Sequence, residues 1–209
     1  YSKNRDNYLP MTAAPTPPMP LVSIGATANA VAVSPDNSYW AVGYNGTTPL
    51  PGYLLLYKRD LVTGQLSQLL SPFGPAPLPD SDVLALGWSP SSTYLAVGQN
   101  SAPQLRIYKN SGGDAFNELT GAAGPQSQPS APLKGIAFSV SDSYLAVLDN
   151  TGSLSVYNRT PGTDIFTVPS PADGSTPSGN IQAIAFSPNG QYFAAAYNGT
   201  LKVYKMNYS

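Results

Sequence analysis

IAFSPNGQYFAAAYNG, at residues 184–199, is one of four copies of the same pattern along this chain. The other copies are AVAVSPDNSYWAVGYNG at 30–46, ALGWSPSSTYLAVGQN at 85–100 and IAFSVSDSYLAVLDNTG at 136–152. Each copy is followed by a short segment that ends in a tyrosine and polar residues, and these segments read YLLLYKR, LRIYKN, LSVYNR and LKVYKM. Repetition of this kind predicts an array built from one structural unit.

Two tyrosines in each copy give the length of the unit. The first follows the Ser-Pro turn and recurs at Tyr39, Tyr94, Tyr144 and Tyr192. The second ends the following segment and recurs at Tyr57, Tyr108, Tyr157 and Tyr204. Both series advance by about 50 residues per copy, a length that suits a propeller blade of four strands.

Residues 133–168 show how one unit is expected to fold. Residues 133–139 and 144–148 are nearly continuous apolar runs, which are typical of strands covered on both faces. Residues 154–157 alternate apolar and polar side chains, and 165–168 form a weaker fourth strand. Turn sequences, including Asn-Gly pairs in other copies, separate the strands. The sequence therefore predicts an all-β fold, a β-propeller made of four-stranded antiparallel blades.

Packing of each blade on the next should form the core, because a lone sheet with two apolar faces is unstable in water. Large side chains recur at matched positions of the first and second strands of each copy. The residues expected in the structural core are Val33, Trp40, Trp88, Phe138, Phe186, Tyr39, Tyr94, Tyr144 and Tyr192.

The phase of the repeat divides a single propeller domain into five parts. Residues 1–23 are expected to supply an outer strand and a Pro-rich lead-in. The blades are expected at 24–70, 71–120, 121–168 and 169–209, the last without an outer strand of its own. An open arc would leave apolar faces in water, so three closures stay open at this point. They are a larger ring of roughly six to eight blades, a self-sealed ring of four, and one ring shared by two chains.

The composition narrows the range of functions. Charged residues make up 10% of the 209 residues and the net charge is −1, so no basic surface for nucleic acid is expected. No apolar run approaches the length that crosses a bilayer, and no membrane insertion is expected. Cysteine and histidine are both absent, which removes thiolate and imidazole chemistry. We assign no catalytic residue, no cofactor and no metal site from the sequence.

Candidate partner-binding residues lie in the turns and in the long Pro-rich connections that lead into the inner strands. Such connections lie on one face of a propeller, and proline lowers the ordering cost of binding there. Phe73 is the large apolar residue within them and is a candidate anchor. Asp80 and Asp82 precede an inner strand and are candidates to line a channel mouth and hold a cation. Tyr44 and Tyr197 flank Asn-Gly turns and suit glycan or protein contacts, with packing in the core or rim as the competing interpretation.

The segment IAFSPNGQYFAAAYNGTLKVYK, at 184–205, resembles the WD40 type of propeller repeat. The closing Trp-Asp pair of that family is replaced here by pairs that begin with tyrosine, and the Gly-His pair is missing. The variant with Tyr-Leu-Ala-Val and a Tyr-Lys-Arg ending is similar to repeats of bacterial and bacteriophage origin. Those repeats occur in tail fibres and other virion-surface proteins, so the resemblance implies a virion structural or adhesion role, by analogy of fold alone.

Three functional hypotheses follow. The first is a non-enzymatic virion-surface or extracellular adhesion protein, such as a phage tail-fibre, receptor-binding or decoration component. It would be present in many copies and would bind protein partners in a larger assembly and a cell-surface glycan or protein receptor. The alternative is a cytoplasmic WD40-type protein-interaction scaffold. The third is a propeller hydrolase, which clustered carboxylates or a metal in the channel would favour.

Overall fold

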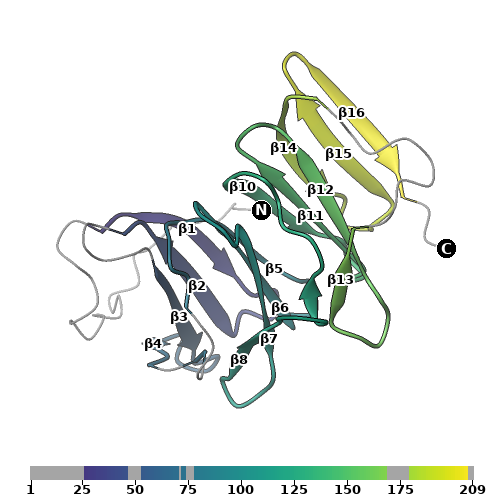
Figure 1. Ribbon diagram of the computed structural model, residues 1–209. Helices are drawn as coiled ribbons and strands as arrows, with labels where there is room; N and C mark the ends of the chain where they lie inside the picture. The colour runs from purple at the N-terminus through teal and green to yellow at the C-terminus, as the bar shows by residue number, and fades with distance from the viewer. Residues whose placement is uncertain (1–25, 47–52, 71, 74–77, 169–178, 207–209) are drawn as a thin grey trace, which may run out of the picture.

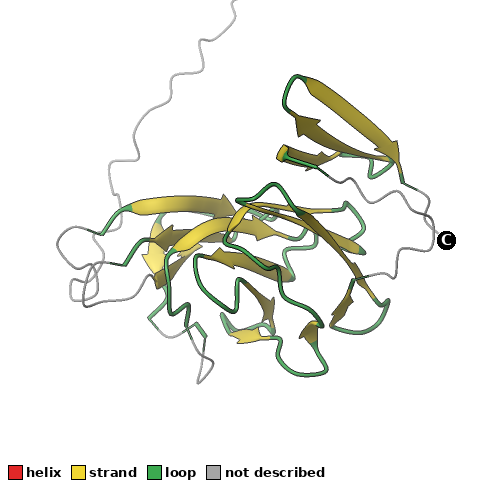
Figure 2. Ribbon diagram, turned by 45° about the horizontal axis from the view of Figure 1, so that its top comes forward, coloured by secondary structure: helices red, strands yellow, loops and turns green. Residues whose placement is uncertain are grey.

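The computed structural model describes residues 26–46, 53–70, 72–73, 78–168 and 179–206. These residues form four sheets that stand side by side in an arc (Figures 1 and 2). The prediction of an all-β propeller built from antiparallel blades is confirmed. The described part of the chain contains no helix, and therefore no helix that could span a membrane.

Each blade is a meander in which strands pair in chain order. Blade 1 consists of β1 (Ala28–Val33), β2 (Tyr39–Tyr44), β3 (Tyr53–Arg59) and β4 (Leu66–Gln68). Blade 2 consists of β5 (Val83–Trp88), β6 (Tyr94–Gln99), β7 (Leu105–Asn110) and β8 (Phe116–Glu118). Blade 3 consists of β10 (Leu133–Phe138), β11 (Tyr144–Asp149), β12 (Leu154–Arg159) and β13 (Ile165–Thr167), with β9 (Gly124–Pro125) added in parallel to β13. Blade 4 consists of β14 (Ile181–Phe186), β15 (Tyr192–Tyr197) and β16 (Thr200–Lys205).

A serine and a tyrosine of the repeat close the first turn of every blade. The serine Oγ accepts a hydrogen bond from the backbone N–H of the tyrosine, and the serine N–H donates to the tyrosine carbonyl. The four pairs are Ser34–Tyr39, Ser89–Tyr94, Ser139–Tyr144 and Ser187–Tyr192. A side-chain acceptor that satisfies a turn N–H stabilises the reversal of the chain, which explains why both residue types recur.

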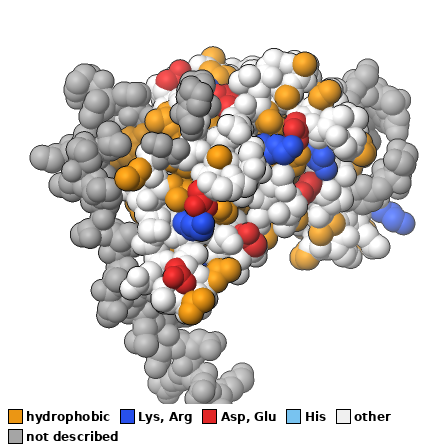
Figure 3. Space-filling model, turned by 90° about the horizontal axis from the view of Figure 1, so that it is seen from below, with side chains coloured by type: hydrophobic (Ala, Val, Ile, Leu, Met, Phe, Trp, Pro, Cys, Tyr) orange, Lys and Arg blue, Asp and Glu red, His pale blue; other side chains and the backbone are white. Residues whose placement is uncertain are grey.

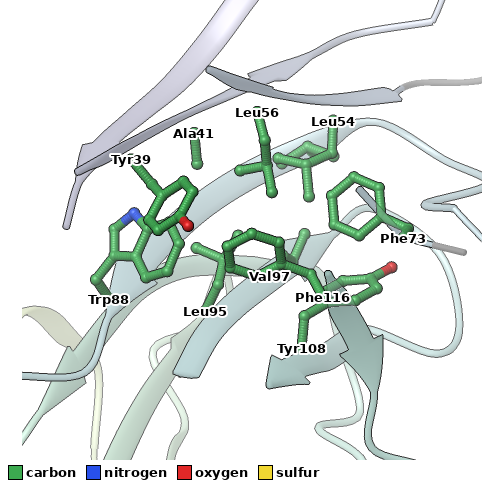
Figure 4. Close-up of a cluster of buried hydrophobic side chains, with 11 residues drawn as sticks. Tyr39, Ala41, Leu54, Leu56, Phe73, Trp88, Leu95, Val97, Tyr108 and Phe116 are labelled. Atoms are coloured by element: carbon green, nitrogen blue, oxygen red, sulfur yellow. The ribbon is translucent and has the colours of Figure 1, made fainter. Parts of the chain in front are cut away.

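Three apolar cores fill the spaces between successive blades. In the core between blades 1 and 2, Tyr39 packs edge-on against Phe116 with ring centroids 5.1 Å apart (Figure 4). The Trp88 indole lies in the same core, and its N–H donates to the carbonyl of Ala32 at 3.3 Å. Each buried side chain of this size contributes about 1.5–3 kcal/mol, so interblade packing dominates the stability of the arc.

Glycines let neighbouring blades approach closely at three points. A Cβ added to Gly43 would lie 2.3 Å from Cγ1 of Val83 on the next blade, one added to Gly87 would lie 2.6 Å from Cγ2 of Ile136, and one added to Gly98 would lie 2.7 Å from Cβ of Leu133. No side chain fits in these gaps without displacement of its neighbour. Small residues are therefore required where the backbone of one sheet faces a branched side chain of the next.

A polar contact, which we call the blade clasp, ties adjacent blades at the rim where the β3–β4 and β7–β8 turns lie. Asp114 of blade 2 accepts hydrogen bonds from the Tyr39 hydroxyl at 2.7 Å and the Lys58 ammonium at 2.8 Å, both on blade 1. The same arrangement joins blades 3 and 2, where the members are Asp164, Tyr94 and Lys109. Each clasp orders two blades relative to one another through charge-assisted hydrogen bonds.

The core expectation needs correction at the ends of the arc. Tyr39, Tyr94, Trp88 and Phe138 are buried, whereas Trp40, Tyr144 and Phe186 are only partly buried. Val33 and Tyr192, which were expected in the core, are exposed. Both lie on the outward faces of blades 1 and 4, where the arc ends and no further blade follows among the described residues.

Blades 1 and 4 lie at opposite ends of the arc, so the described residues do not form a self-sealed ring of four (Figure 1). The outer strand expected within residues 1–23 lies outside the described residues. The same holds for parts of the Pro-rich connections, at 74–77 and 169–178.

Candidate functional site

A buried ionic cluster lies between blades 1 and 2, on the rim opposite the clasps. Arg106 of β7 donates from Nη1 to both carboxylate oxygens of Glu118, at 2.9 and 3.0 Å. Its Nε donates to the Gln99 side-chain oxygen at 2.9 Å, and its Nη2 lies 3.4 Å from Oδ1 of Asp80. Gln99 also donates to the same Asp80 oxygen at 3.2 Å. We call these four residues the Arg106 cluster.

The members of the cluster differ in how far they are exposed to solvent. The Arg106 and Glu118 side chains are only 6% and 7% exposed, whereas the Asp80 side chain is 61% exposed. Burial raises the pKa of Glu118, and the bidentate contact with Arg106 opposes that rise. Glu118 already neutralises the positive charge of Arg106. The negative charge of Asp80 is therefore not balanced within the cluster, and it lies at the surface.

The repeat pattern explains why only blade 2 carries this cluster. Strand pairing shows that the position of Arg106 is occupied by Leu55 in blade 1 and Ser155 in blade 3. Blade 4 has a cation there, Lys202, but its described residues include no fourth strand to supply a partner like Glu118. The partner position of Glu118 is occupied by Gln68 in blade 1. Arg106, Gln99 and Glu118 were not among the residues predicted from the sequence. These three residues differ from the residues at the equivalent positions of other blades. This difference is the sequence signal that could have revealed them.

Asp80 and Asp82, predicted to lie together at a channel mouth, have different roles in the structure. Asp80 belongs to the Arg106 cluster, whereas Oδ1 of Asp82 accepts a hydrogen bond from the Gly46 N–H at 2.7 Å. The Asp82 carbonyl also accepts from the Asn100 N–H, so this residue links the ends of three strands. Within the described ranges no group of three or more acidic, histidine or cysteine side chains is placed to hold a metal ion.

Phe73, predicted as a surface anchor, is instead buried. Its ring packs against Tyr108 at a centroid distance of 4.8 Å and against Phe116 at 6.4 Å (Figure 4). The Phe73 side chain belongs to the apolar core between blades 1 and 2. It therefore closes a core and is not available to a partner.

The two candidate tyrosines are partly buried and engaged with their own blades. Tyr44 stacks on Tyr53 of the neighbouring strand, with ring centroids 4.7 Å apart. The Tyr197 hydroxyl lies 3.4 Å from that of Tyr204, and the Lys202 ammonium lies over the Tyr197 ring at 4.9 Å. These contacts are within single sheets, so neither tyrosine belongs to the Arg106 cluster.

The surface near Asp80 combines a carboxylate with an apolar side chain. Leu78, two residues before Asp80 in the chain, is exposed. Charged side chains elsewhere are sparse, as the view in Figure 3 shows for one face of the molecule. A negative charge next to an exposed leucine differs from the rest of this weakly charged surface, and it marks this rim as a candidate contact surface.

Comparisons with known proteins agree with the architecture. Residues 172–205 match the family model described as WD domain, G-beta repeat. No curated protein matches the chain. The fold defines a β-propeller, and the match identifies one WD40-like repeat within it, at residues 172–205.

Several solved propellers resemble the chain at low sequence identity. A putative 6-phosphogluconolactonase from Bacteroides uniformis superposes with a TM-score of 0.60 at 16% identity, over 87% of this chain and 51% of that one. The periplasmic gluconolactonase PpgL of Pseudomonas aeruginosa gives 0.58 at 16% identity, over 87% and 50%. The Cps50 (Swd1) propeller domain of Myceliophteria thermophila gives 0.55 at 15% identity, over 87% and 55%. A chain of the Mitotic Checkpoint Complex gives 0.53 at 17% identity, over 85% and 48%.

These findings correct the functional prediction. The expectation of a non-enzymatic virion-surface adhesion protein is wrong, because the similar structures include lactonases as well as WD40-type propellers of other kinds. At these identities the likeness establishes the fold and not the activity. The chain also spans only about half the length of the solved propellers that it matches.

Proposed function

We propose that this chain is part of a WD40-type protein-interaction scaffold, whose contact surface is the rim around Asp80. The observation that carries the proposal is the position of the Asp80 carboxylate. It is exposed to solvent, and buried Arg106 and Gln99 contact its Oδ1. The WD40 match and the likeness to a chain of the Mitotic Checkpoint Complex support a role in protein assembly. An acidic group fixed in this way is preorganised, which lowers the cost of binding a cationic side chain.

The chemistry of the rim defines the kind of partner. Exposed Leu78 precedes Asp80 by two residues, so a complementary segment carries a lysine or arginine next to an apolar side chain. A partly exposed charge pair of this kind contributes modestly to affinity and more to the choice of partner. The apolar contacts would supply most of the binding free energy.

A displayed peptide library tests this proposal. Peptides selected on the full chain should be enriched in basic residues next to leucine, isoleucine or phenylalanine. The variant Asp80→Asn should weaken the selected peptides about tenfold. Asp60→Asn, which removes an exposed charge on the opposite rim, is the matched control and should leave binding unchanged. Selection of peptides without a basic residue, or equal loss in both variants, would exclude the proposed surface.

A second candidate function is lactone hydrolysis, which the lactonase-like fold and the paired carboxylates of the Arg106 cluster favour. In this case Asp80 takes a proton from water as the water oxygen attacks the lactone carbonyl. The ring C–O bond then breaks, and the proton passes from Asp80 to the departing ring oxygen. The Arg106 guanidinium, 3.4 Å from Asp80, would stabilise the developing oxyanion.

Hydrolysis of gluconolactone and 6-phosphogluconolactone separates the two candidates. Lactonase activity requires a rate above the spontaneous one that falls at least a hundredfold in Asp80→Asn and persists in Asp60→Asn. If the full chain hydrolyses these lactones no faster than buffer alone, the hydrolase is excluded. The peptide-binding experiment then decides whether the chain is a protein-interaction scaffold.

A further inference from the structure

Every interface within the arc joins two unlike faces. We call the face that a blade turns towards the next blade its forward face, and the opposite one its rear face. In the first interface the forward face of blade 1 contributes Leu54 and Leu56, and the rear face of blade 2 contributes Trp88, Leu95 and Val97. The second and third interfaces repeat this arrangement. A forward face is thus built to receive a rear face.

Strand register identifies the equivalent residues in each blade. Pairing between the second and third strands places Leu54, Leu105, Leu154 and Leu201 at one forward-face position. The same pairing places Leu56, Ile107, Val156 and Val203 at the next. On the rear face, pairing between the first and second strands makes Ala28 the equivalent of Val83, Leu133 and Ile181.

The two terminal faces keep this apolar character, and no other blade covers them among the described residues. Leu201 and Val203 on the forward face of blade 4 are 65% and 58% exposed, whereas Leu54 and Leu56 are 3% and 0% exposed. On the rear face of blade 1, Val31 is 65% exposed and Ala28 is also exposed. Val83, Leu133 and Ile181, the equivalents of Ala28, are fully buried. Apolar side chains at such positions are stable only when another sheet covers them.

The exposed faces are complementary to each other, which identifies their occupant. One is a forward face and the other a rear face, and they lie at opposite ends of the arc (Figures 1 and 2). At the position where Gly43 faces Val83 and Gly98 faces Leu133, the terminal faces carry two alanines, Ala196 and Ala28, so neither face has a bulky side chain there that would hold the sheets apart. The third interface has two larger residues, Leu148 and Ile181, at this position.

We propose that two copies of this chain associate head to tail, with the forward face of blade 4 of each copy on the rear face of blade 1 of the other. The two contacts close a two-fold ring of eight blades, within the known range of propeller sizes. This inference rests on the blade faces and is independent of the contact surface around Asp80.

The junction between copies has no clasp of the kind that joins blades 1 and 2 and blades 2 and 3. Tyr192 and Lys205 of blade 4 occupy the clasp positions of Tyr39 and Lys58, but the clasp aspartate is replaced in blade 1 by Gly64. The association should therefore be weaker than those two interfaces, and reversible. Gly64 has φ +75°, close to the φ of +66° of Asp114, so an aspartate at position 64 can adopt the backbone that Asp114 has.

Light scattering after size-exclusion chromatography tests the proposal over a range of concentrations. The full chain should be a dimer that dissociates on dilution, and the double variant Leu201→Glu, Val203→Glu should be a folded monomer by circular dichroism. Val140→Glu with Val168→Glu places the same charges at exposed positions of blade 3, away from both terminal faces, and should stay dimeric. A wild-type monomer at the highest soluble concentration would overturn the proposal, whether the faces stay bare or another partner covers them. Open-ended polymers would overturn the closed ring.

A variant that strengthens the dimer and a disulfide cross-link test the same junction. Neither depends on a variant that loses association because it fails to fold. Gly64→Asp should supply the missing clasp and tighten the dimer about tenfold, and Tyr192→Phe should cancel that gain. Because the chain has no cysteine, Ala28→Cys with Ala196→Cys should form disulfides between copies in air. No gain from Gly64→Asp together with no cross-link would contradict the geometry of the junction.

Discussion

Tyr39 and Asp114 are 75 positions apart in the sequence and are joined by a hydrogen bond of 2.7 Å between blades 1 and 2. Asp114 holds the Lys58 ammonium at the same time, so one carboxylate links two strands of the preceding blade. The same contact recurs one blade further on, between Tyr94 and Asp164. The arc is thus held by apolar cores inside and by carboxylate clasps at one rim.

The clasps predict how stability changes with pH. Hydrogen bonds from Lys58 and Tyr39 hold the pKa of Asp114 below its ordinary value. A carboxyl group with a lowered pKa in the folded state stabilises it fully above the unfolded value and loses that contribution as pH falls through the folded value. The free energy of unfolding should therefore decrease as pH is lowered below about 4.

Asp114→Asn tests this prediction by urea titration at several pH values. The variant should lose about 1–2 kcal/mol at neutral pH and show a shallower decrease in acid. Tyr39→Phe removes one hydrogen-bond donor to Asp114 and keeps the ion pair between Asp114 and Lys58. The free energy of unfolding of this variant should therefore depend on acid pH more strongly than that of Asp114→Asn. Parallel pH profiles for wild type and Asp114→Asn would show that the clasp does not contribute.

The core between blades 1 and 2 should be sensitive to truncation of Phe116. This ring is fully buried and contacts Tyr39, Phe73 and Trp88. Phe116→Ala should lower the free energy of unfolding by about 3–5 kcal/mol, measured by chemical denaturation. Val62→Ala, at an exposed turn position, should change it by less than about 0.5 kcal/mol.

The close contact between Gly43 and Val83 predicts a compensating pair of mutations. Gly43→Ala should destabilise the fold by about 1–3 kcal/mol, because its Cβ would overlap Val83. Val83→Gly in the same chain should recover part of the loss. Gly135→Ala is a suitable control, since its Cβ would lie 3.4 Å from Cβ of Leu148, an ordinary contact. Equal thermal midpoints for Gly43→Ala and Gly135→Ala would contradict the close approach of the blades.

The buried pair Arg106–Glu118 predicts a non-additive result. Arg106→Leu alone leaves a buried carboxylate and should cost about 3–5 kcal/mol. Adding Glu118→Gln recreates the leucine and glutamine that blade 1 has at these positions, and should recover much of that stability. Double-mutant analysis of the unfolding free energies measures this coupling. Additive losses would indicate that the pair is not coupled in solution.

Local sequence features predicted the strands and turns because they act over a few residues. The Ser34–Tyr39 turn contact, the Asn-Gly pairs and the apolar runs are all visible within one copy of the repeat. Which face of a sheet is covered depends on the neighbouring blade, and the repeat pattern assigns Val33 and Tyr192 the environment of internal blades. Their exposure is a property of position in the arc and not of local sequence.

The site was less predictable because its members come from separate segments. Asp80, Gln99 and Glu118 meet at Arg106 only after three strands of blade 2 and the preceding connection are in place. Phe73 was misassigned for a related reason, since its burial depends on residues of two blades and leaves no periodic signal in the sequence. A residue that differs from its equivalents in other blades is a more useful guide to such sites. Arg106 is an example, because its equivalents in blades 1 and 3 are a leucine and a serine.

The most direct test of the account is the rate at which single cysteines react when placed at three equivalent positions, Leu56, Ile107 and Val203, in a chain that has no cysteine of its own. The account predicts that the first two are protected until the fold opens, and that the third reacts rapidly when the protein is dilute and slowly when it is concentrated. Equal reactivity at all three positions would contradict blade-on-blade packing. Reactivity at position 203 that does not depend on concentration would contradict the paired ring.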